Sequence, residues 1–210
     1  MTARKLSHLV RERDRLRVYM TALAGLLVGL LGGLLLVACS GCSITTYTHG
    51  VPNLVQVRPD VYRSGQPISL DQWRYLASLG VRHSIKLDFD DEGTDDLSRL
   101  AGIDVYPLGI EPRTNPDGLI PAVAEVFERP AADRIAALKL AIHEIQAGGK
   151  GGWLIHCKNG HDRTGLAVGF VRVIVDGWSK AQAWHEMLAH GFHPELVGLL
   201  REWWAEEKTP

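Results

Sequence analysis

The 210-residue sequence predicts an α/β fold, with a central, mainly parallel sheet flanked by helices, that follows an N-terminal membrane segment. Short apolar runs typical of strands alternate with stretches whose apolar residues recur at helical spacing. This strand, helix, strand, helix order favours parallel strands joined by helices. A hydrophobic content of 46% is also sufficient for a core of ordinary size.

Residues 18–38 form an almost uncharged apolar run that follows an excess of basic residues. This pattern is typical of an N-terminal membrane signal whose basic flank stays in the cytoplasm. Leu-Val-Ala-Cys at 36–39 fits a bacterial lipoprotein box, in which residues 1–38 are removed and Cys39 is lipidated. Because about 20 apolar residues suffice to cross a bilayer, an uncleaved single-span anchor is the alternative. We favour the lipoprotein, and in both cases we expect a membrane-anchored domain that faces the periplasm.

Residues 39–50 are expected to form a short tether, and residues 51–210 one domain. Residues 1–38 hold 6 of the 23 basic and 2 of the 24 acidic residues, so the rest of the chain has 17 basic and 22 acidic residues, a net charge of −5. This acidic body offers no electrostatic surface for nucleic acid. Cys157 stands far from the other two cysteines, so a disulfide framework is not expected. A solitary thiol in an oxidising compartment favours a chemical use for it.

The first half of the domain is predicted to alternate strands with one helix. Residues 55–62 indicate two short strands separated by a turn. Ser69 is placed as the N-cap of a helix that ends at Gly80. The next strands are predicted at residues 81–89 and 103–108.

An acidic cluster accompanies the end of the strand at 81–89: Asp88, Asp90, Asp91, Glu92, Asp95 and Asp96. Its spacing matches no calcium loop, so we interpret it as a solvated loop and not as a metal site. Near the C-terminus, three histidines lie close together in the sequence: His185, His190 and His193. They miss the H-E-x-x-H register of zinc hydrolases, so no metal site is expected there either.

The second half of the domain is predicted to be mostly helical. Residues 109–130 are irregular and rich in proline, as many functional loops are. Residues 131–146 carry apolar side chains on one helical face and lead, after two glycines, into a further strand. A capping box at Ser179 and Gln182 starts one later helix, and Pro194 is placed at the start of the last.

Residues 153–165, W-L-I-H-C-K-N-G-H-D-R-T-G, combine a buried strand at 153–155 with a polar loop, and the apolar stretch 166–175 is predicted to form the helix that follows. Unpaired N–H groups and the helix dipole make such a loop an anion site. Cys157 begins the loop and Arg163 ends it, so we expect a thiolate near neutral pH beside a guanidinium that can hold two phosphate oxygens. Gly160 and Gly165 let the backbone turn its N–H groups inward.

This loop resembles the Cys-x5-Arg-Ser/Thr signature of the cysteine-dependent protein tyrosine and dual-specificity phosphatases. Residues 51–67, V-P-N-L-V-Q-V-R-P-D-V-Y-R-S-G-Q-P, together with 79–87, are similar to the opening segment of the small bacterial and fungal branch of that family. The resemblance spans roughly residues 50–190 and implies a dual-specificity phosphatase-like fold.

The resemblance also implies a reaction that needs neither metal nor cofactor. Cys157 would attack the phosphorus of a monoester, and water would cleave the resulting cysteinyl-phosphate. Arg163 and the loop amides would stabilise the equatorial oxygens, and Thr164 would donate a hydrogen bond to the departing sulfur. The residues expected to bind the substrate are Lys158, Asn159, Gly160, His161, Thr164 and Gly165.

Three aspartates are candidates for the general acid that protonates the leaving group. In the family this acid usually comes from the loop before the preceding helix, which here makes Asp117 and Asp133 candidates. Asp162 lies immediately before Arg163, as in C-x4-D-R members in which an acid inside the loop has that role. An orienting contact to the loop amides is the alternative for Asp162.

Phosphotyrosine in a phosphorylated protein is the first expected substrate. Basic residues at Lys158 and His161 resemble the phosphoinositide-directed members, so a phosphoinositide or inositol phosphate is the alternative. Two other classes of protein also fit parts of the pattern: a catalytically silent phosphate-binding module and a rhodanese-like sulfurtransferase. Arg163, Thr164 and the upstream Y-R-S-G-Q-P favour the phosphatase.

Overall fold

The computed structural model describes residues 49–113 and 126–205, which belong to one compact unit, Ser43–Pro210. The apolar run at 18–38, the lipidation candidate Cys39 and the candidate acid Asp117 lie outside the described residues. Among the described residues, no helix combines the length and the apolar character that a membrane span requires.

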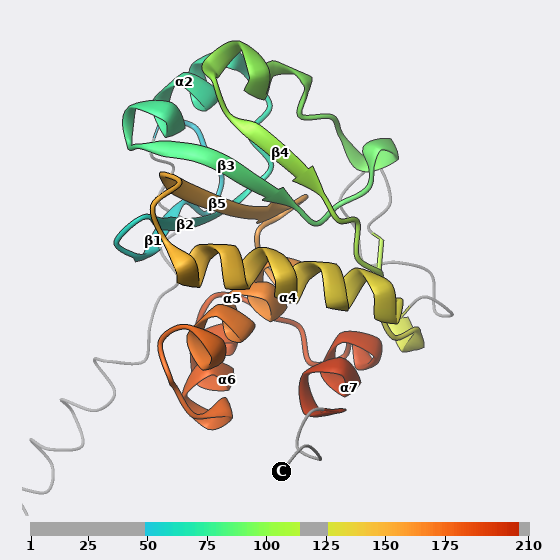
Figure 1. Cartoon of the computed structure of the whole chain (residues 1–210). Helices are drawn as coiled ribbons and strands as arrows, with labels where there is room; N and C mark the ends of the chain where they lie inside the picture. The colour runs from blue at the N-terminus through green and yellow to red at the C-terminus, as the bar shows by residue number, and fades with distance from the viewer. Residues whose placement is uncertain (1–48, 114–125, 206–210) are drawn as a thin grey trace, which may run out of the picture. The chain divides into compact units, whose positions relative to one another are not determined.

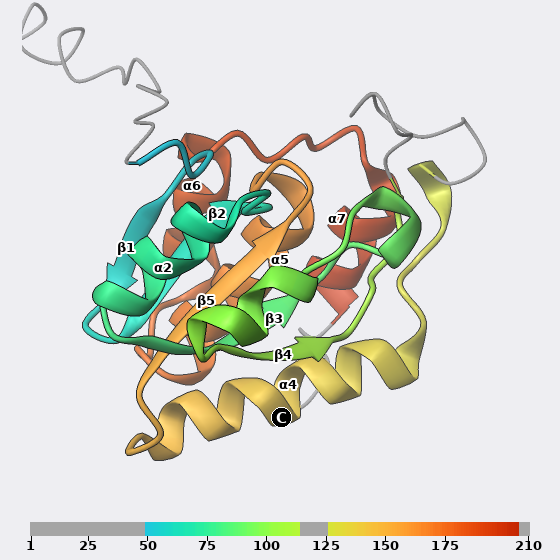
Figure 2. The same cartoon turned by 90° about the horizontal axis from the view of Figure 1, so that it is seen from above.

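A five-stranded sheet forms the middle layer, in the order β1-β2-β5-β3-β4. Its strands are β1 (Val55–Arg58), β2 (Val61–Gly65), β3 (Val81–Lys86), β4 (Asp104–Pro107) and β5 (Gly152–Cys157). β1 and β2 are antiparallel, and the other neighbouring pairs are parallel, so the sheet is mixed. The α/β architecture expected from the sequence is confirmed, and β5 is the central strand (Figure 2).

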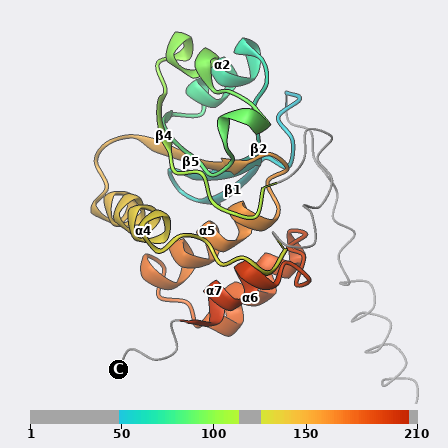
Figure 3. The same cartoon turned by 90° about the vertical axis from the view of Figure 1, so that its right-hand side faces the viewer.

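Helices cover both faces of this sheet (Figures 1 and 3). The helices are α2 (Leu70–Ser78), the 3-10 turns η1 (Asp90–Glu92) and η2 (Asp96–Ala101), α4 (Ala132–Ala147), α5 (Asp162–Ile174), α6 (Lys180–Ala189) and α7 (Val197–Ala205). α2 lies on one face and packs against η2, whereas α4 and α5 lie on the other. α6 and α7 pack on α5, so α5 is enclosed between them and the sheet.

Side chains of β5 alternate between two hydrophobic clusters, as the two-residue period of a strand requires. Trp153 and Ile155 belong to the cluster that contains α4 and α5, and Leu154 to the cluster on the α2 side. Cys157 therefore falls on the α5 side. His156 falls on the α2 side, where its ring lies edge-on to Trp73. This alternation sets which groups surround each side of the loop that follows β5.

The capping signals for two helix starts are confirmed, whereas α5, predicted at 166–175, already begins at Asp162. Ser69 and Ser179 each accept a hydrogen bond from the backbone N–H three residues later, which completes a capping box in both cases. The last helix, however, begins at Val197 and not at Pro194. The reason is that residues 193–196 first form a turn closed by a backbone hydrogen bond of 3.0 Å.

Candidate active site

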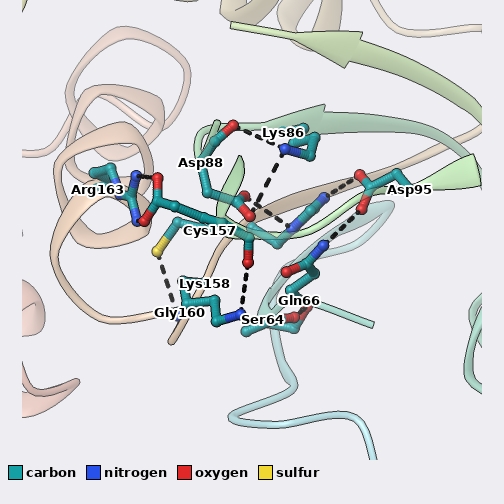
Figure 4. Close-up of polar contacts among 12 residues, drawn as sticks. Ser64, Gln66, Lys86, Asp88, Asp95, Cys157, Lys158, Gly160 and Arg163 are labelled. Atoms are coloured by element: carbon teal, nitrogen blue, oxygen red, sulfur yellow. Dashed lines mark hydrogen bonds and ion pairs between the residues drawn. The ribbon is translucent and has the colours of Figure 1, made fainter. Parts of the chain in front are cut away.

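The loop between β5 and α5 begins at Cys157, the last residue of its strand. Every residue of β5 is buried, which holds the start of the loop at the centre of the sheet. Cys157 is a free cysteine, 3% exposed, and its Sγ accepts a hydrogen bond of 3.3 Å from the Gly160 N–H (Figure 4). The loop ends in the first turn of α5, which contains Asp162 and Arg163. The predicted strand, loop and helix are therefore present.

Four consecutive carbonyl groups of the loop accept hydrogen bonds, three from the upstream segment 51–67 and one from the first turn of α5. The pairs are Lys158 with the Gln66 N–H (3.2 Å), Asn159 with the Asn53 Nδ2 (2.8 Å), Gly160 with the Arg63 Nη2 (2.8 Å) and His161 with the Gly165 N–H (2.7 Å). Because a trans peptide group points its C=O and the following N–H in opposite directions, the N–H groups of residues 159–162 face inward. The bond from Gly160 to the sulfur agrees with this direction. The loop is therefore a cradle of N–H groups above Cys157, which suits an anion.

The upstream segment that carries the second sequence match packs directly along this cradle. β2 pairs with β5 in parallel register and places Gly65 opposite Cys157. Gly160 has a φ of +77°, and a Cβ on it would lie 2.4 Å from the backbone nitrogen of Gly65. Only glycine avoids both the strained φ and the collision at this position.

Arg163 is held by Glu92 through two hydrogen bonds, Nη1 to Oε2 at 2.7 Å and Nη2 to Oε1 at 2.8 Å. Burial alone would lower the pKa of Arg163, but the hydrogen bonds of Glu92 together with the charges of Cys157, Glu92 and Asp88 outweigh it, so this pKa is raised. The Glu92 carboxylate also accepts from the Phe89 N–H at 3.0 Å. Arg163 is thus a permanent cation whose orientation depends on η1.

The acidic cluster after β3 is only partly a solvated loop, which corrects the interpretation of the sequence. Asp88, Glu92 and Asp95 are buried, whereas the other three members are exposed. Their partners come from β5 and α5: Arg163 holds Glu92, and the His156 Nε2 lies 2.9 Å from the Asp95 Oδ2. Strand spacing alone could not show these pairs, because they join segments about 60 to 70 residues apart.

A buried network of charged groups therefore lies under the α2 side of the loop. The Asp88 side chain is fully buried, 3.7 Å from the His156 Nδ1 and 3.8 Å from the Lys86 Nζ (Figure 4). Burial raises the pKa of Asp88, and the charges of His156 and Lys86 oppose that rise. Period-two alternation could have predicted that Lys86, Asp88 and His156 share this face.

The other predicted substrate-binding residues belong to the loop and the first turn of α5, and both basic ones have protein partners. The Lys158 Nζ donates to the Glu92 carbonyl at 2.6 Å, and the His161 Nε2 lies 2.8 Å from the Asn53 Nδ2. Burial lowers the pKa of His161. The buried Thr164 hydroxyl has no hydrogen-bond partner within 49–113 and 126–205.

The two described candidates for the general acid have different surroundings. The Asp162 Oδ1 accepts from the His193 N–H at 2.7 Å and lies 2.9 Å from the His193 Nδ1. Asp133 is exposed in the first turn of α4. Of the histidines near the C-terminus, His193 is thus a partner of the loop. Across the part of the chain that is described, no three His, Cys, Asp or Glu side chains are grouped to hold a metal ion.

Known proteins resemble this chain in sequence. Two curated relatives are the inositol diphosphatase DSP5 of Arabidopsis thaliana, 31% identical over 141 residues, and the dual specificity protein phosphatase TpbA of Pseudomonas aeruginosa, 30% identical over 146 residues. These matches cover 64% and 68% of this chain. The chain spans only 60% and 56% of the two relatives.

Solved structures resemble the fold as well. A crystal structure of P. aeruginosa TpbA matches with a TM-score of 0.51 and 25% identity, and the match covers 77% of this chain and 92% of that chain. A complex of a TpbA variant with phosphotyrosine matches with a TM-score of 0.53 and 23% identity, over 80% of this chain and 93% of that one. The sequence profile of the tyrosine phosphatase family matches residues 51–194, which include the loop and the upstream segment. The chain belongs to the tyrosine phosphatase family.

Proposed function

We propose that this protein hydrolyses phosphomonoesters through a cysteinyl-phosphate intermediate. The observation that carries this proposal is the ring of inward N–H groups above the buried Cys157, with the guanidinium of Arg163 beside it. A phosphoryl group in transfer spreads negative charge over three equatorial oxygens, which such a ring and a guanidinium stabilise. Family membership supports the same chemistry.

The reaction would proceed in two displacements. In the first, the Cys157 thiolate bonds to phosphorus while the bond between phosphorus and the ester oxygen breaks, and a general acid protonates the leaving oxygen. In the second, water attacks phosphorus, the sulfur–phosphorus bond breaks and inorganic phosphate leaves. The Thr164 hydroxyl would donate a hydrogen bond to the departing thiolate. Water is the only co-reactant that the balance requires.

Phosphotyrosine or another phosphorylated residue of a protein is the first proposed substrate. TpbA is named a dual specificity protein phosphatase, and a variant of it has been solved with phosphotyrosine, which supports this choice. An inositol phosphate is the second candidate, because DSP5 is named an inositol diphosphatase. The Lys158 ammonium uses one of its three N–H donors on the Glu92 carbonyl, which leaves two donors for a second phosphate group.

The test of the proposed reaction uses para-nitrophenyl phosphate and the full-length protein in detergent. Turnover should be lost on thiol alkylation and in Cys157→Ser, should persist with chelator, and should persist in the control Cys42→Ser. Cys157→Ser should still bind vanadate. A wild-type protein that binds vanadate without turnover would instead be a silent phosphate-binding module. Thiosulfate-dependent transfer of sulfur without phosphatase activity would indicate a sulfurtransferase.

We further propose that the N-terminus anchors the domain at the membrane with the domain on the periplasmic side. The support is the apolar run at 18–38, its basic flank and the lipoprotein box at Cys39. Incorporation of labelled fatty acid that is lost in Cys39→Ala would establish lipidation. An unlabelled, uncleaved chain in the membrane fraction would establish the single-span anchor, and protease digestion of intact spheroplasts would report the side.

A further inference from the structure

The guanidinium of Arg63 is a buried cation beside the loop. This residue of β2 is 2% exposed and faces the α5 side of the sheet, the same side as Cys157. Its Nη2 donates to the Gly160 carbonyl at 2.8 Å and more weakly to the His161 carbonyl at 3.5 Å. Its Nη1 is buried without a hydrogen-bond partner among residues 49–113 and 126–205. Burial lowers the pKa of Arg63 to about 10.

The carboxylates around Arg63 are engaged with other groups. Glu186 of α6 is bound by Arg172 of α5 through two hydrogen bonds of 2.6 and 2.7 Å. Asp162 is bound by the backbone and ring of His193. Burying an unpaired charge is costly, so a guanidinium persists in such a place only when an anion nearby offsets it. Of the acidic groups near Arg63, Cys157 opposes the lowering of the Arg63 pKa most, ahead of Glu186 and Asp162. An anion bound in the loop above the sulfur would add to this negative charge.

The contacts of Arg63 also set the direction of two peptide groups. The carbonyls of Gly160 and His161 point toward its Nη2, so the N–H groups of His161 and Asp162 point into the cradle. Loss of this donor would leave the buried Gly160 carbonyl without the partner that turns it outward. Arg63 therefore acts on the shape of the anion site as well as on its charge.

We propose that Arg63 is a positioning residue of the active site: it fixes the inward orientation of the loop N–H groups, and its buried charge stabilises the thiolate of Cys157. This inference rests on the proposed function, because it assigns a role to a residue that supports the reacting loop without touching the phosphoryl group. The hairpin of β1 and β2 is far from the loop in sequence. Through Arg63 it thus contributes to the reactivity of Cys157.

The charge role is tested on the full-length protein without any substrate. The rate of Cys157 alkylation by iodoacetamide is measured against pH in a Cys39→Ala/Cys42→Ala background. Arg63→Gln should move the midpoint of this profile upward by about one pH unit or more, since the positive charge is gone. The control Arg82→Gln should leave it unchanged, because Arg82 also donates to two backbone carbonyls, at 2.7 and 2.8 Å, but is exposed. An unchanged midpoint in a folded Arg63→Gln protein would overturn the charge role.

The shape role is tested with Arg63→Lys, which keeps the charge and loses the planar fork. This variant should keep a wild-type alkylation midpoint but bind vanadate at least tenfold more weakly, and unchanged vanadate binding would overturn the shape role. If Arg63→Gln does not fold, Arg63→Lys decides the charge role too, because this variant keeps the positive charge, so a raised alkylation midpoint contradicts that role. None of these readouts needs turnover. A wild-type protein without phosphatase activity would therefore refute the proposed function while the alkylation profiles still decide this inference.

Discussion

Glu92 and Arg163, 71 residues apart in sequence, are joined by two hydrogen bonds of 2.7 and 2.8 Å in a region shielded from solvent. The same glutamate accepts from the Phe89 N–H with its carboxylate and from Lys158 with its carbonyl. One residue of η1 therefore contacts both the start and the end of the loop. The position of the guanidinium relative to the sulfur depends on this pair.

Glu92→Gln should weaken catalysis more than it weakens folding. The amide has one acceptor oxygen in place of two and no charge, so the paired hydrogen bonds to the two guanidinium nitrogens are lost and Arg163 is displaced from the phosphoryl group. A displacement of about 1 Å can cost on the order of 100-fold in rate. We expect a decrease of that size in kcat/KM for para-nitrophenyl phosphate and weaker inhibition by phosphate. Asp91→Asn is the matched control, because Asp91 lies in the same turn with its side chain 65% exposed. Equal kinetics in both variants would contradict the role of Glu92.

Local signals in the sequence predicted the elements that carry the loop. The apolar run before Cys157, the capping serines and the order of strands and helices all act through neighbours in the chain, and they correspond to observed elements. Cys157 and Arg163 could be found in the same way, since one short loop holds both. What places them at the centre of the sheet is β5, whose continuous burial is visible in its apolar residues.

The partners of these residues could not be predicted from local patterns. Glu92, Asp95 and Arg63 are about 60 to 100 residues from the groups they bind, and each stands in a stretch that is polar by itself. A polar run after a strand is usually solvated, so burial of half the acidic cluster depends on the cations and the imidazole supplied by other elements. The contacts between these distant residues determine which of them are buried. These contacts follow from the order of strands in the sheet.

Gly160→Ala should destroy the site for a steric reason. The new Cβ would lie 2.4 Å from the Gly65 nitrogen and 2.5 Å from the Ser64 carbonyl carbon, and these backbone atoms of β2 cannot yield to it cheaply. We expect loss of vanadate binding and of turnover. Gly102→Ala is the control, because Gly102 also has a positive φ, +73°, but has no atom within 4 Å of the added Cβ. That variant should lose only about 1 to 2 kcal/mol of unfolding free energy and keep its activity.

His161 and His190 should make the protein less stable in acid. Burial lowers the pKa of both below the ordinary value of 6.5, and the charge of Arg63 acts in the same direction on each. The unfolded chain thus binds these protons at a higher pH than the folded protein does. The stability that the neutral imidazoles provide is complete above pH 6.5 and is lost as the pH falls from there through the lowered pKa values.

Denaturant unfolding between pH 7.5 and 4.5 checks this expectation. His161→Asn and His190→Asn should each remove part of the decline in the free energy of unfolding at low pH. The part removed is at most about 1.4 kcal/mol per pH unit, the value for one proton. His143→Asn, at an exposed position of α4, should leave the decline unchanged. If the free energy of unfolding depends on pH in the same way in the wild-type protein, in His161→Asn and in His190→Asn, these histidines do not cause the decline.

The general acid can be assigned by comparing three aspartate variants, Asp117→Asn, Asp133→Asn and Asp162→Asn. Removing the acid should abolish the alkaline limb of the pH–rate profile, and the loss should be larger for phenyl phosphate than for para-nitrophenyl phosphate, because the poorer leaving group needs the proton more. Asp162 is bound by the N–H and ring of His193, so we expect Asp162→Asn to act on orientation and to lower the rate for both substrates by the same factor. His193→Gln should then reproduce the effect of Asp162→Asn, since it removes the ring side of the same contact. A loss in Asp162→Asn that grows with the basicity of the leaving group would instead identify the acid inside the loop.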